Sequence, residues 1–163
     1  MFLGLFACEG SRETAPRLRA GTKAPDFSIQ DLKGQTWTLD QVKGKVVLLR
    51  FWTDQCPHCR FEMPVIEKVY RRLRPAGFEV LAVNVKQSPQ VAEAFMAQMD
   101  ITFPVVLDRD GKTTKEYGVY AIPTNFLIDR NGVIGRKLIG EAFTKEKNLS
   151  QFLQNYFPDK LLE

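Results

Sequence analysis

The chain has 163 residues, 44% hydrophobic and 26% charged, which is the balance of one soluble globular domain. Three cysteines and one histidine are too few for a His-rich metal site, a Cys-only zinc cage or a disulfide-stapled miniprotein. A net charge of +4 is too mild to predict nucleic-acid binding. The densest basic cluster, Arg71, Arg72 and Arg74, lies at an expected helix end, where cations face backbone carbonyls. No apolar run approaches the length of a membrane span.

The first 20 residues differ from the rest of the chain. Residues 1–7 are apolar and uncharged, Cys8 follows, and residues 9–20 are polar. This pattern predicts a leader remnant and tether over residues 1–20. We expect one folded domain over residues 21–163.

The first half of the domain alternates strands with a helix. Alternating apolar residues predict a hairpin over 26–39, with its turn at Lys33-Gly34. An apolar run over 46–52, broken only by Arg50, predicts a strand buried on both faces. Apolar residues at helical spacing predict an amphipathic helix over 57–73, and the run over 78–85 predicts a second buried strand.

The second half continues this alternation and ends in a hairpin. Ser88 caps a predicted helix that runs to Met99, and a strand over 103–107 and a short helix over 113–117 follow. Strands over 126–128 and 133–139 flank Asn131-Gly132, a strong hairpin signal, and Thr144 is the predicted N-cap of the last helix. This order predicts an α/β fold, with a central mixed sheet flanked by helices and an added N-terminal hairpin.

The chemistry-bearing motif is Cys56-Pro57-His58-Cys59, at the junction of a buried strand and a helix. A spacing of three in a first helical turn lets the two sulfurs form a disulfide or a dithiol. Cys56 lies at the helix N-terminus, beside unpaired N–H groups and the positive end of the helix dipole. His58 adds a further dipole or charge. Both effects favour the Cys56 thiolate over the thiol. Pro57 does not weaken the helix at its first position, because the N–H that proline lacks would have no partner there. Cys59 is the predicted resolving thiol.

A metal site is the structural alternative for the cysteine pair. A single C-x-x-C is also half of a zinc site, but the chain has neither a second pair nor a free histidine. We therefore expect no metal, and no cofactor beyond the redox-active Cys56/Cys59 disulfide.

Several ordered motifs resemble the thioredoxin superfamily, and within it the TlpA/ResA type of bacterial extracytoplasmic thiol-disulfide oxidoreductase. Phe51-Trp52 leads into the cysteine pair, and Pro64 follows the second cysteine by five positions. The similarity spans roughly residues 21–157, and the further stretches that carry it are 24–27, 39–47, 59–64, 77–85 and 121–129.

The resemblance implies a thioredoxin-like fold and a substrate site beside the cysteines. It implies that Ile122-Pro123 is a cis peptide facing the pair, whose neighbouring backbone stays open to a substrate strand. Trp52 would pack beside the site, although an aromatic residue at a strand end is also typical core. The implied partners are cysteine-containing protein substrates and a redox partner protein, and we expect a monomer.

Two departures from the family concern proton transfer. Thioredoxin has a buried acid where this chain has Arg50, and ResA-type proteins have a glutamate where we align Gln87. Proton handling would then fall to His58, to Glu62 or to water. Glu62 matches the family motif, but an exposed glutamate on a helix surface is the plainer interpretation.

The dipeptide inside the motif and the family point in opposite redox directions. Pro-His is the pair of the strongly oxidising DsbA, whereas most TlpA/ResA-type proteins are reductants. A stabilised thiolate makes the disulfide a better oxidant. We expect a Cys56 pKa below neutral and a potential more oxidising than that of thioredoxin.

The third cysteine, Cys8, bears on where in the cell the protein is located. Leu5-Phe6-Ala7-Cys8 resembles a bacterial lipobox, although Phe6 is bulky and the leader is short. Either the true start lies upstream and Cys8 is lipidated, which would attach the chain to a membrane, or Cys8 is an ordinary tail thiol. The family resemblance separately implies a bacterial extracytoplasmic location, periplasmic or membrane-anchored.

Two rival functions remain. A peroxiredoxin-like peroxidase is suggested by Thr53-x-x-Cys56, but that family also needs a proline where this chain has Leu49. A membrane-tethered Cu(I)-binding protein could use Cys56 and Cys59 as soft ligands, although related copper proteins have a longer cysteine spacing and a distant histidine.

Overall fold

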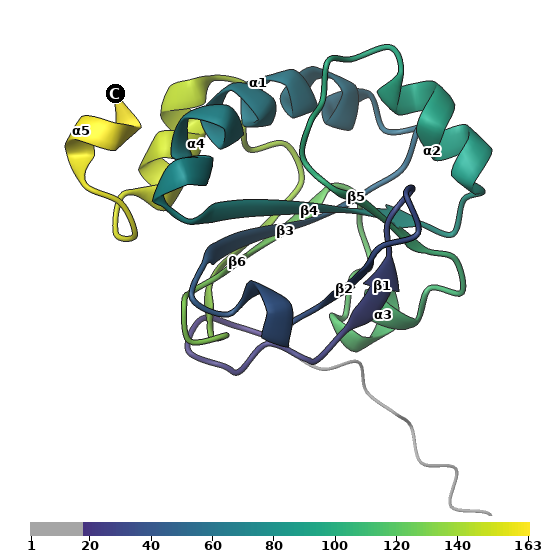
Figure 1. Ribbon diagram of the computed structural model, residues 1–163, viewed down its shortest axis with the longest axis horizontal. Coiled ribbons are helices and arrows are strands. Elements are labelled where there is room, and N and C mark those ends of the chain that lie inside the picture. The colour runs from purple at the N-terminus through teal and green to yellow at the C-terminus, as the bar shows by residue number, and fades with distance from the viewer. Residues whose placement is uncertain (1–17) are drawn as a thin grey trace, which may run out of the picture.

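The structure is a computed structural model and describes residues 18–163 (Figure 1). Its centre is a five-stranded mixed sheet in the order β5-β4-β3-β6-β7. The strands are β3 (Val46–Trp52), β4 (Phe78–Val85), β5 (Val105–Asp108), β6 (Thr124–Ile128) and β7 (Ile134–Ile139). The helices are α1 (Pro57–Leu73), α2 (Pro89–Met96), α3 (Lys112–Glu116), α4 (Glu146–Leu153) and α5 (Asp159–Leu162), with 3₁₀ turns at Asp40–Val42 and Arg74–Ala76. The predicted mixed sheet is confirmed.

The central strand β3 carries the site at its carboxyl end. Every residue of β3 is buried, as the continuous apolar run predicts for a strand covered on both faces. β3 pairs in parallel with β4 and antiparallel with β6, so α1 crosses over between β3 and β4. The register sets Arg50 opposite Asn125 and Trp52 opposite Asn84.

Two buried clusters fill the two faces of the sheet. One lies under α1, α2 and α4, and it includes Trp52, Cys56 and Cys59 (Figure 1). The other lies under the N-terminal segment and the hairpin, and it includes Phe51 and Tyr117. Alternate residues of β3 supply the two clusters, because successive side chains of a strand point to opposite faces. Both faces of the strand that leads to the site are therefore packed against a buried cluster.

The N-terminal hairpin consists of β1 (Ser28–Gln30) and β2 (Thr36–Thr38), which form a separate antiparallel pair. The Asp31 carboxylate closes its turn by accepting the N–H groups of Lys33 and Gln35 at 2.8 and 2.9 Å. The same carboxylate accepts the indole N–H of Trp37 at 2.9 Å. One side chain at the turn thus adds three hydrogen bonds to the backbone pairing of the hairpin.

Several predicted boundaries are wrong by one to three residues. β6 begins at Thr124 and not at residue 126, β7 begins at Ile134 and not at residue 133, and α3 covers Lys112–Glu116 and not 113–117. α2 ends at Met96 and not at Met99, because short i to i+3 bonds replace the helical ladder there, including Met99 N–H to the Met96 carbonyl at 3.0 Å. β5 begins at Val105 and not at residue 103. Thr144 is not the N-cap of α4, since the cap is Lys145, whose N–H donates to Asn148 Oδ1 at 3.1 Å.

The basic cluster at the end of α1 is engaged within the fold. Arg71 binds Glu67 and Asp100, Arg72 binds Glu146, and Arg74 lies over the ring of Tyr70. These contacts agree with the expectation that the cluster belongs to a helix end. Among residues 18–163, no helix has both the length and the apolar character that crossing a membrane would require.

Candidate active site at the β3–α1 junction

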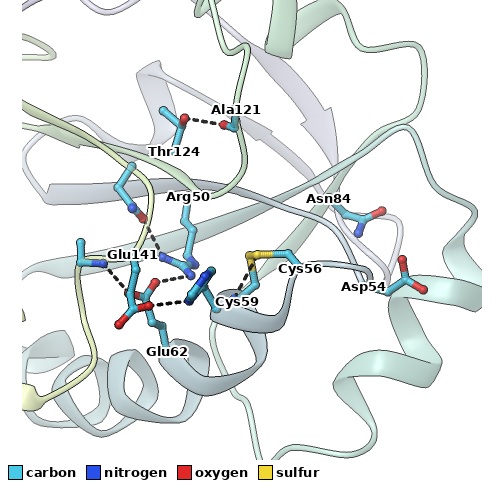
Figure 2. The surroundings of a disulfide bond; sticks show 12 residues. Arg50, Asp54, Cys56, Cys59, Glu62, Asn84, Ala121, Thr124 and Glu141 are labelled. Carbon is cyan, nitrogen blue, oxygen red and sulfur yellow. Dashed lines mark hydrogen bonds and ion pairs between the residues drawn. A yellow bond between two sulfur atoms is a disulfide. The ribbon is translucent and has the colours of Figure 1, made fainter.

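Cys56 and Cys59 form a disulfide where β3 gives way to α1 (Figure 2). Their Cα atoms are 5.2 Å apart. A turn leads from the strand into the helix, and in it the Cys56 N–H donates to the Thr53 carbonyl at 3.3 Å. The predicted pairing of these two cysteines is therefore present in the fold.

Cys56 is the N-cap of α1, and Pro57 occupies the first helical turn as predicted. The Cys59 N–H donates to the Cys56 sulfur at 3.1 Å, so a helix-terminal donor already points at this sulfur. Charge-assisted bonds of this kind strengthen when the acceptor becomes an anion. Cys56 keeps 7% of its surface exposed, whereas Cys59 is completely buried. Of the two paired cysteines, Cys56 is therefore the one that solvent reaches.

The predicted cis peptide is present between Ile122 and Pro123, just before β6. Pro123 is buried and Ile122 is partly exposed. The Pro123 carbonyl is occupied by the Gly140 N–H at 2.8 Å. Thr124 closes the turn by donating its hydroxyl to the Ala121 carbonyl at 2.7 Å (Figure 2). Ala121 and Thr124 lie in the surroundings of the disulfide.

Trp52 is fully buried beneath the site. Its ring packs against Phe95 of α2 with centroids 4.8 Å apart, inside the same cluster as both cysteines. Trp52 therefore supports the cysteine loop from within the core, and its contact with a substrate stays a prediction.

His58 lies on the exposed surface of the first helical turn and pairs with a residue that the sequence did not single out. Its Nδ1 is 2.5 Å from the Glu141 carboxylate, which lies in the loop between β7 and α4 (Figure 2). About half of each side chain is exposed. This contact joins the cysteine helix to the loop beside it at the surface.

Glu62 is completely buried, so the interpretation of an exposed helix-surface glutamate is wrong. Its Oε2 lies 2.6 Å from Nη2 of Arg50, which is also fully buried. Arg50 Nη1 donates to Asn125 Oδ1 at 2.9 Å. The physical reason is charge compensation, since an arginine inside a buried strand needs a buried carboxylate. We call Arg50, Glu62 and Asn125 the buried network. Its member Arg50 stands at the sequence position where thioredoxin has a buried acid.

The buried network also fixes the loop between β7 and α4. Glu62 Oε1 accepts the N–H groups of Ala142 and Phe143 at 2.5 and 2.6 Å. The cysteine helix, the strand after the cis peptide and the loop that carries Glu141 are therefore tied to one ion pair (Figure 2). Burial lowers the pKa of Arg50, and the charge of Glu62 opposes this shift.

On the other side of the disulfide, Gln87 contacts the turn that precedes Cys56. Its side-chain amide donates to the Asp54 carboxylate, and its carbonyl oxygen accepts the Asp54 N–H at 3.0 Å and the Asn84 amide at 2.8 Å. Lys86, just before it, has a positive φ of 54°. Gln87, which we aligned with the ResA-type glutamate, therefore holds the cysteine turn through hydrogen bonds.

Sequence reasoning missed Glu141, Asn125 and Asp54 as neighbours of the site. The charged residue inside the apolar run over 46–52 was the one usable signal, because it implied a buried partner of opposite charge. Among the described residues, no group of three or more His, Cys, Asp or Glu side chains could hold a metal ion. Cys8 lies outside the described residues.

Comparisons with known proteins identify the family. The model of the AhpC/TSA family matches residues 20–137. The thiol-disulfide oxidoreductase ResA of Geobacillus thermodenitrificans (strain NG80-2) is 40% identical over 138 residues, covering 85% of this chain and 78% of that protein.

Solved structures agree with this assignment. A Chlorobium tepidum protein provisionally named thiol:disulfide interchange protein DsbE has a TM-score of 0.77 and 34% identity, covering 90% of this chain and 99% of that one. The exposed lipoprotein thioredoxin of Streptococcus pneumoniae strain TIGR4 has a TM-score of 0.70 and 28% identity, covering 80% of this chain and 99% of that one. The expected thioredoxin-like fold is confirmed, and the chain belongs to the AhpC/TSA family, among its thiol-disulfide oxidoreductases of the ResA type.

Proposed function

We propose that Cys56 is the attacking thiol and Cys59 the resolving thiol of this thiol-disulfide oxidoreductase. The observation that carries the assignment is the asymmetry of the pair. Cys56 keeps some exposed surface and receives an N–H bond at the helix N-terminus, whereas Cys59 is completely buried. Since the thiolate is the attacking species, the sulfur that is both reachable and stabilised as an anion should react first.

The exchange proceeds in two balanced steps in the reducing direction. The Cys56 thiolate attacks one sulfur of a substrate disulfide, so a mixed disulfide forms and the other substrate sulfur leaves with the electron pair. The Cys59 thiolate then attacks the Cys56 sulfur, which forms the Cys56–Cys59 bond and releases the second substrate thiolate. Two electrons pass to the substrate, and a redox partner protein returns them. The oxidising direction is the reverse.

Substrate contact falls to the exposed rim of the site. Pro57 is exposed and Ile122 is partly exposed, and these residues, with Pro123 and Trp52 behind them, are the proposed binding surface for a cysteine-containing protein. Because the Pro123 carbonyl is already bonded to Gly140, a substrate strand would pair with the backbone of Ile122.

His58 and Glu62 are the candidates for proton handling. His58 is at the surface beside Cys56, within reach of solvent. Glu62 stays a candidate from its sequence position, although both of its oxygens already accept hydrogen bonds, an arrangement suited to a carboxylate anion.

Trapping the mixed disulfide tests the two roles. The variant Cys59→Ser should accumulate a covalent complex between Cys56 and a protein substrate, and reducing agents should dissolve it. The variant Cys56→Ser is the matched control, and it should trap nothing. A complex that forms through Cys59 in the Cys56→Ser variant, with none in Cys59→Ser, would reverse the assignment.

We also propose an extracytoplasmic location for a domain over residues 21–163. Support comes from the family, and from a structural relative that is named an exposed lipoprotein. Membrane attachment through Cys8 and a monomeric state stay predictions. Mass spectrometry of native protein should find Cys8 lipidated and N-terminal. A chain that retains Met1 and an unmodified Cys8 would remove the anchor.

The two rival functions give different results in simple assays. A peroxidase would consume peroxide at the expense of the Cys56 thiol. A copper protein would retain Cu(I) on Cys56 and Cys59 and would not exchange disulfides. The proposed function predicts exchange with disulfides, without rapid peroxide turnover.

A further inference from the structure

The buried network under the disulfide has more hydrogen-bond donors than acceptors. Glu62 accepts three bonds, one from Arg50 and two from backbone N–H groups. Arg50 Nε and Asn125 Nδ2 are buried and find no acceptor in the part of the chain that the structure describes. An unpaired buried donor is costly, so an acceptor placed beside these groups would be stabilised.

Cys59 is one helical turn from this network. Cys59 and Glu62 are three positions apart on α1, so their Cβ atoms are roughly 5–6 Å apart. Both residues are fully buried. Arg50 lies on the face of β3 that points to α1, as its bond to Glu62 requires. In Figure 2 the Arg50 side chain extends from β3 toward the first turns of α1, with the disulfide on one side and Glu62 on the other.

The resolving step requires Cys59 to ionise in the protein interior, which disfavours a charge. Cys59 must become a thiolate before it can attack, and a completely buried anion loses its hydration. The charged groups around it are Arg50 on β3 and Glu62 on α1, with His58 and Glu141 at the surface. Of these, only Arg50 is both buried and positively charged.

We propose that Arg50 stabilises the Cys59 thiolate during the resolving step, as a buried cation that replaces the buried acid of thioredoxin. The inference rests on the proposed roles of the two cysteines. When Cys59 ionises, its proton leaves to solvent, and the Arg50 Nε–H, which has no acceptor among the described residues, is available to the new anion. Arg50 is thus a positioning and electrostatic residue for Cys59, and Glu62 keeps it charged and in place.

A single-turnover reaction with an aryl disulfide separates the two steps. Reduced protein is mixed with dithiobis-nitrobenzoate, whose released thiolate absorbs visible light. The first release reports attack by Cys56, and the second reports resolution by Cys59. Both rates are measured across pH in a stopped-flow instrument. If the wild type shows no second release, the proposed function fails, which is a different result from failure of this inference.

Two variants then separate charge from mere positioning. Arg50→Met combined with Glu62→Gln removes both charges and keeps an acceptor for the loop N–H groups. In this double variant the second release should slow about tenfold at neutral pH, with its half-maximal rate about one pH unit higher, while the first stays within about twofold. Glu62→Gln alone keeps the cation, so its second release should be clearly faster than that of the double variant.

A purely structural role, or proton transfer by Glu62, would slow the second release of Glu62→Gln as much as that of the double variant. Either result overturns the inference, and so does a double variant that resolves at the wild-type rate. If Glu62→Gln does not fold, Arg50→Lys serves instead, because it keeps the charge and should resolve faster than the double variant. The matched control is Arg71→Met with Glu67→Gln, an ion pair farther along α1, which should leave both releases unchanged.

Discussion

Removing one partner of the buried Arg50–Glu62 pair should destabilise the fold far more than removing both. Both side chains are fully buried, and their charged atoms are 2.6 Å apart. In Arg50→Met, Glu62 keeps only its two backbone donors and becomes a buried charge without a counter-ion. Breaking such a pair costs about 3–5 kcal/mol, whereas replacing both members is often close to neutral.

We therefore expect Arg50→Met to lose about 3–5 kcal/mol of unfolding free energy, and Arg50→Met with Glu62→Gln to recover at least about 2 kcal/mol of it. For a domain of this size the single variant should melt roughly 10 °C below the wild type. The measurement is urea unfolding of the oxidised proteins, followed by far-UV circular dichroism. The single Glu62→Gln variant completes the cycle.

The exposed pair of Lys43 and Asp40 provides the control. Asp40→Asn should leave the urea midpoint unchanged within error, because a solvated pair contributes little. An Arg50→Met variant that loses less than about 1 kcal/mol, or a double variant whose loss equals the sum of the two single losses, would refute the reasoning about the buried pair.

Three further predictions concern pH, the reactive thiol and a helix cap. Burial raises the pKa of Tyr117 above its ordinary value, so the folded state holds this proton longer than the unfolded state and stability should fall as pH rises above about 10. Tyr117→Phe removes the hydrogen bond from the hydroxyl to the Pro25 carbonyl, so it should lower the unfolding free energy at neutral pH by about 1 kcal/mol. Between about pH 8 and 11, however, the unfolding free energy of this variant in urea should fall less steeply than that of the wild type. Equal slopes for the two proteins would contradict this. Thiolate absorbance of the reduced protein should titrate Cys56 with a midpoint below about pH 7, and a midpoint above about pH 8 would reject the stabilised thiolate. Ser88→Ala removes the N-cap bond to the Val91 N–H at 3.3 Å, so unfolding free energy should drop by about 1 kcal/mol without a change in disulfide exchange.

The cysteine pair and its setting could be predicted from sequence because their signals are local. The buried strand, the helix start and the C-x-x-C spacing occupy consecutive residues, and each has its own periodicity or capping rule. The resemblance added Ile122-Pro123, which no local pattern could bring to the cysteines.

The electrostatics of the site depended on contacts between distant segments. From residue type and position in the helix, Glu62 looks like a surface glutamate. Only the packing of α1 against β3 shows that it pairs with Arg50. His58 and Glu141 come together because the β7–α4 loop is anchored on Glu62. The cap of α4 was wrong for a smaller reason: Asn148 bonds the Lys145 N–H and moves the helix start one residue.

The measurement that tests the central claim most directly is the redox equilibrium of Cys56 and Cys59 against a glutathione series. The account predicts that the pair equilibrates as one two-electron couple, with a potential more oxidising than the value of about −270 mV typical of thioredoxin. A pair that exchanges but lies below this value would contradict the stabilised Cys56 thiolate. A pair that does not equilibrate with glutathione at all would contradict the assignment of these two cysteines as the redox centre.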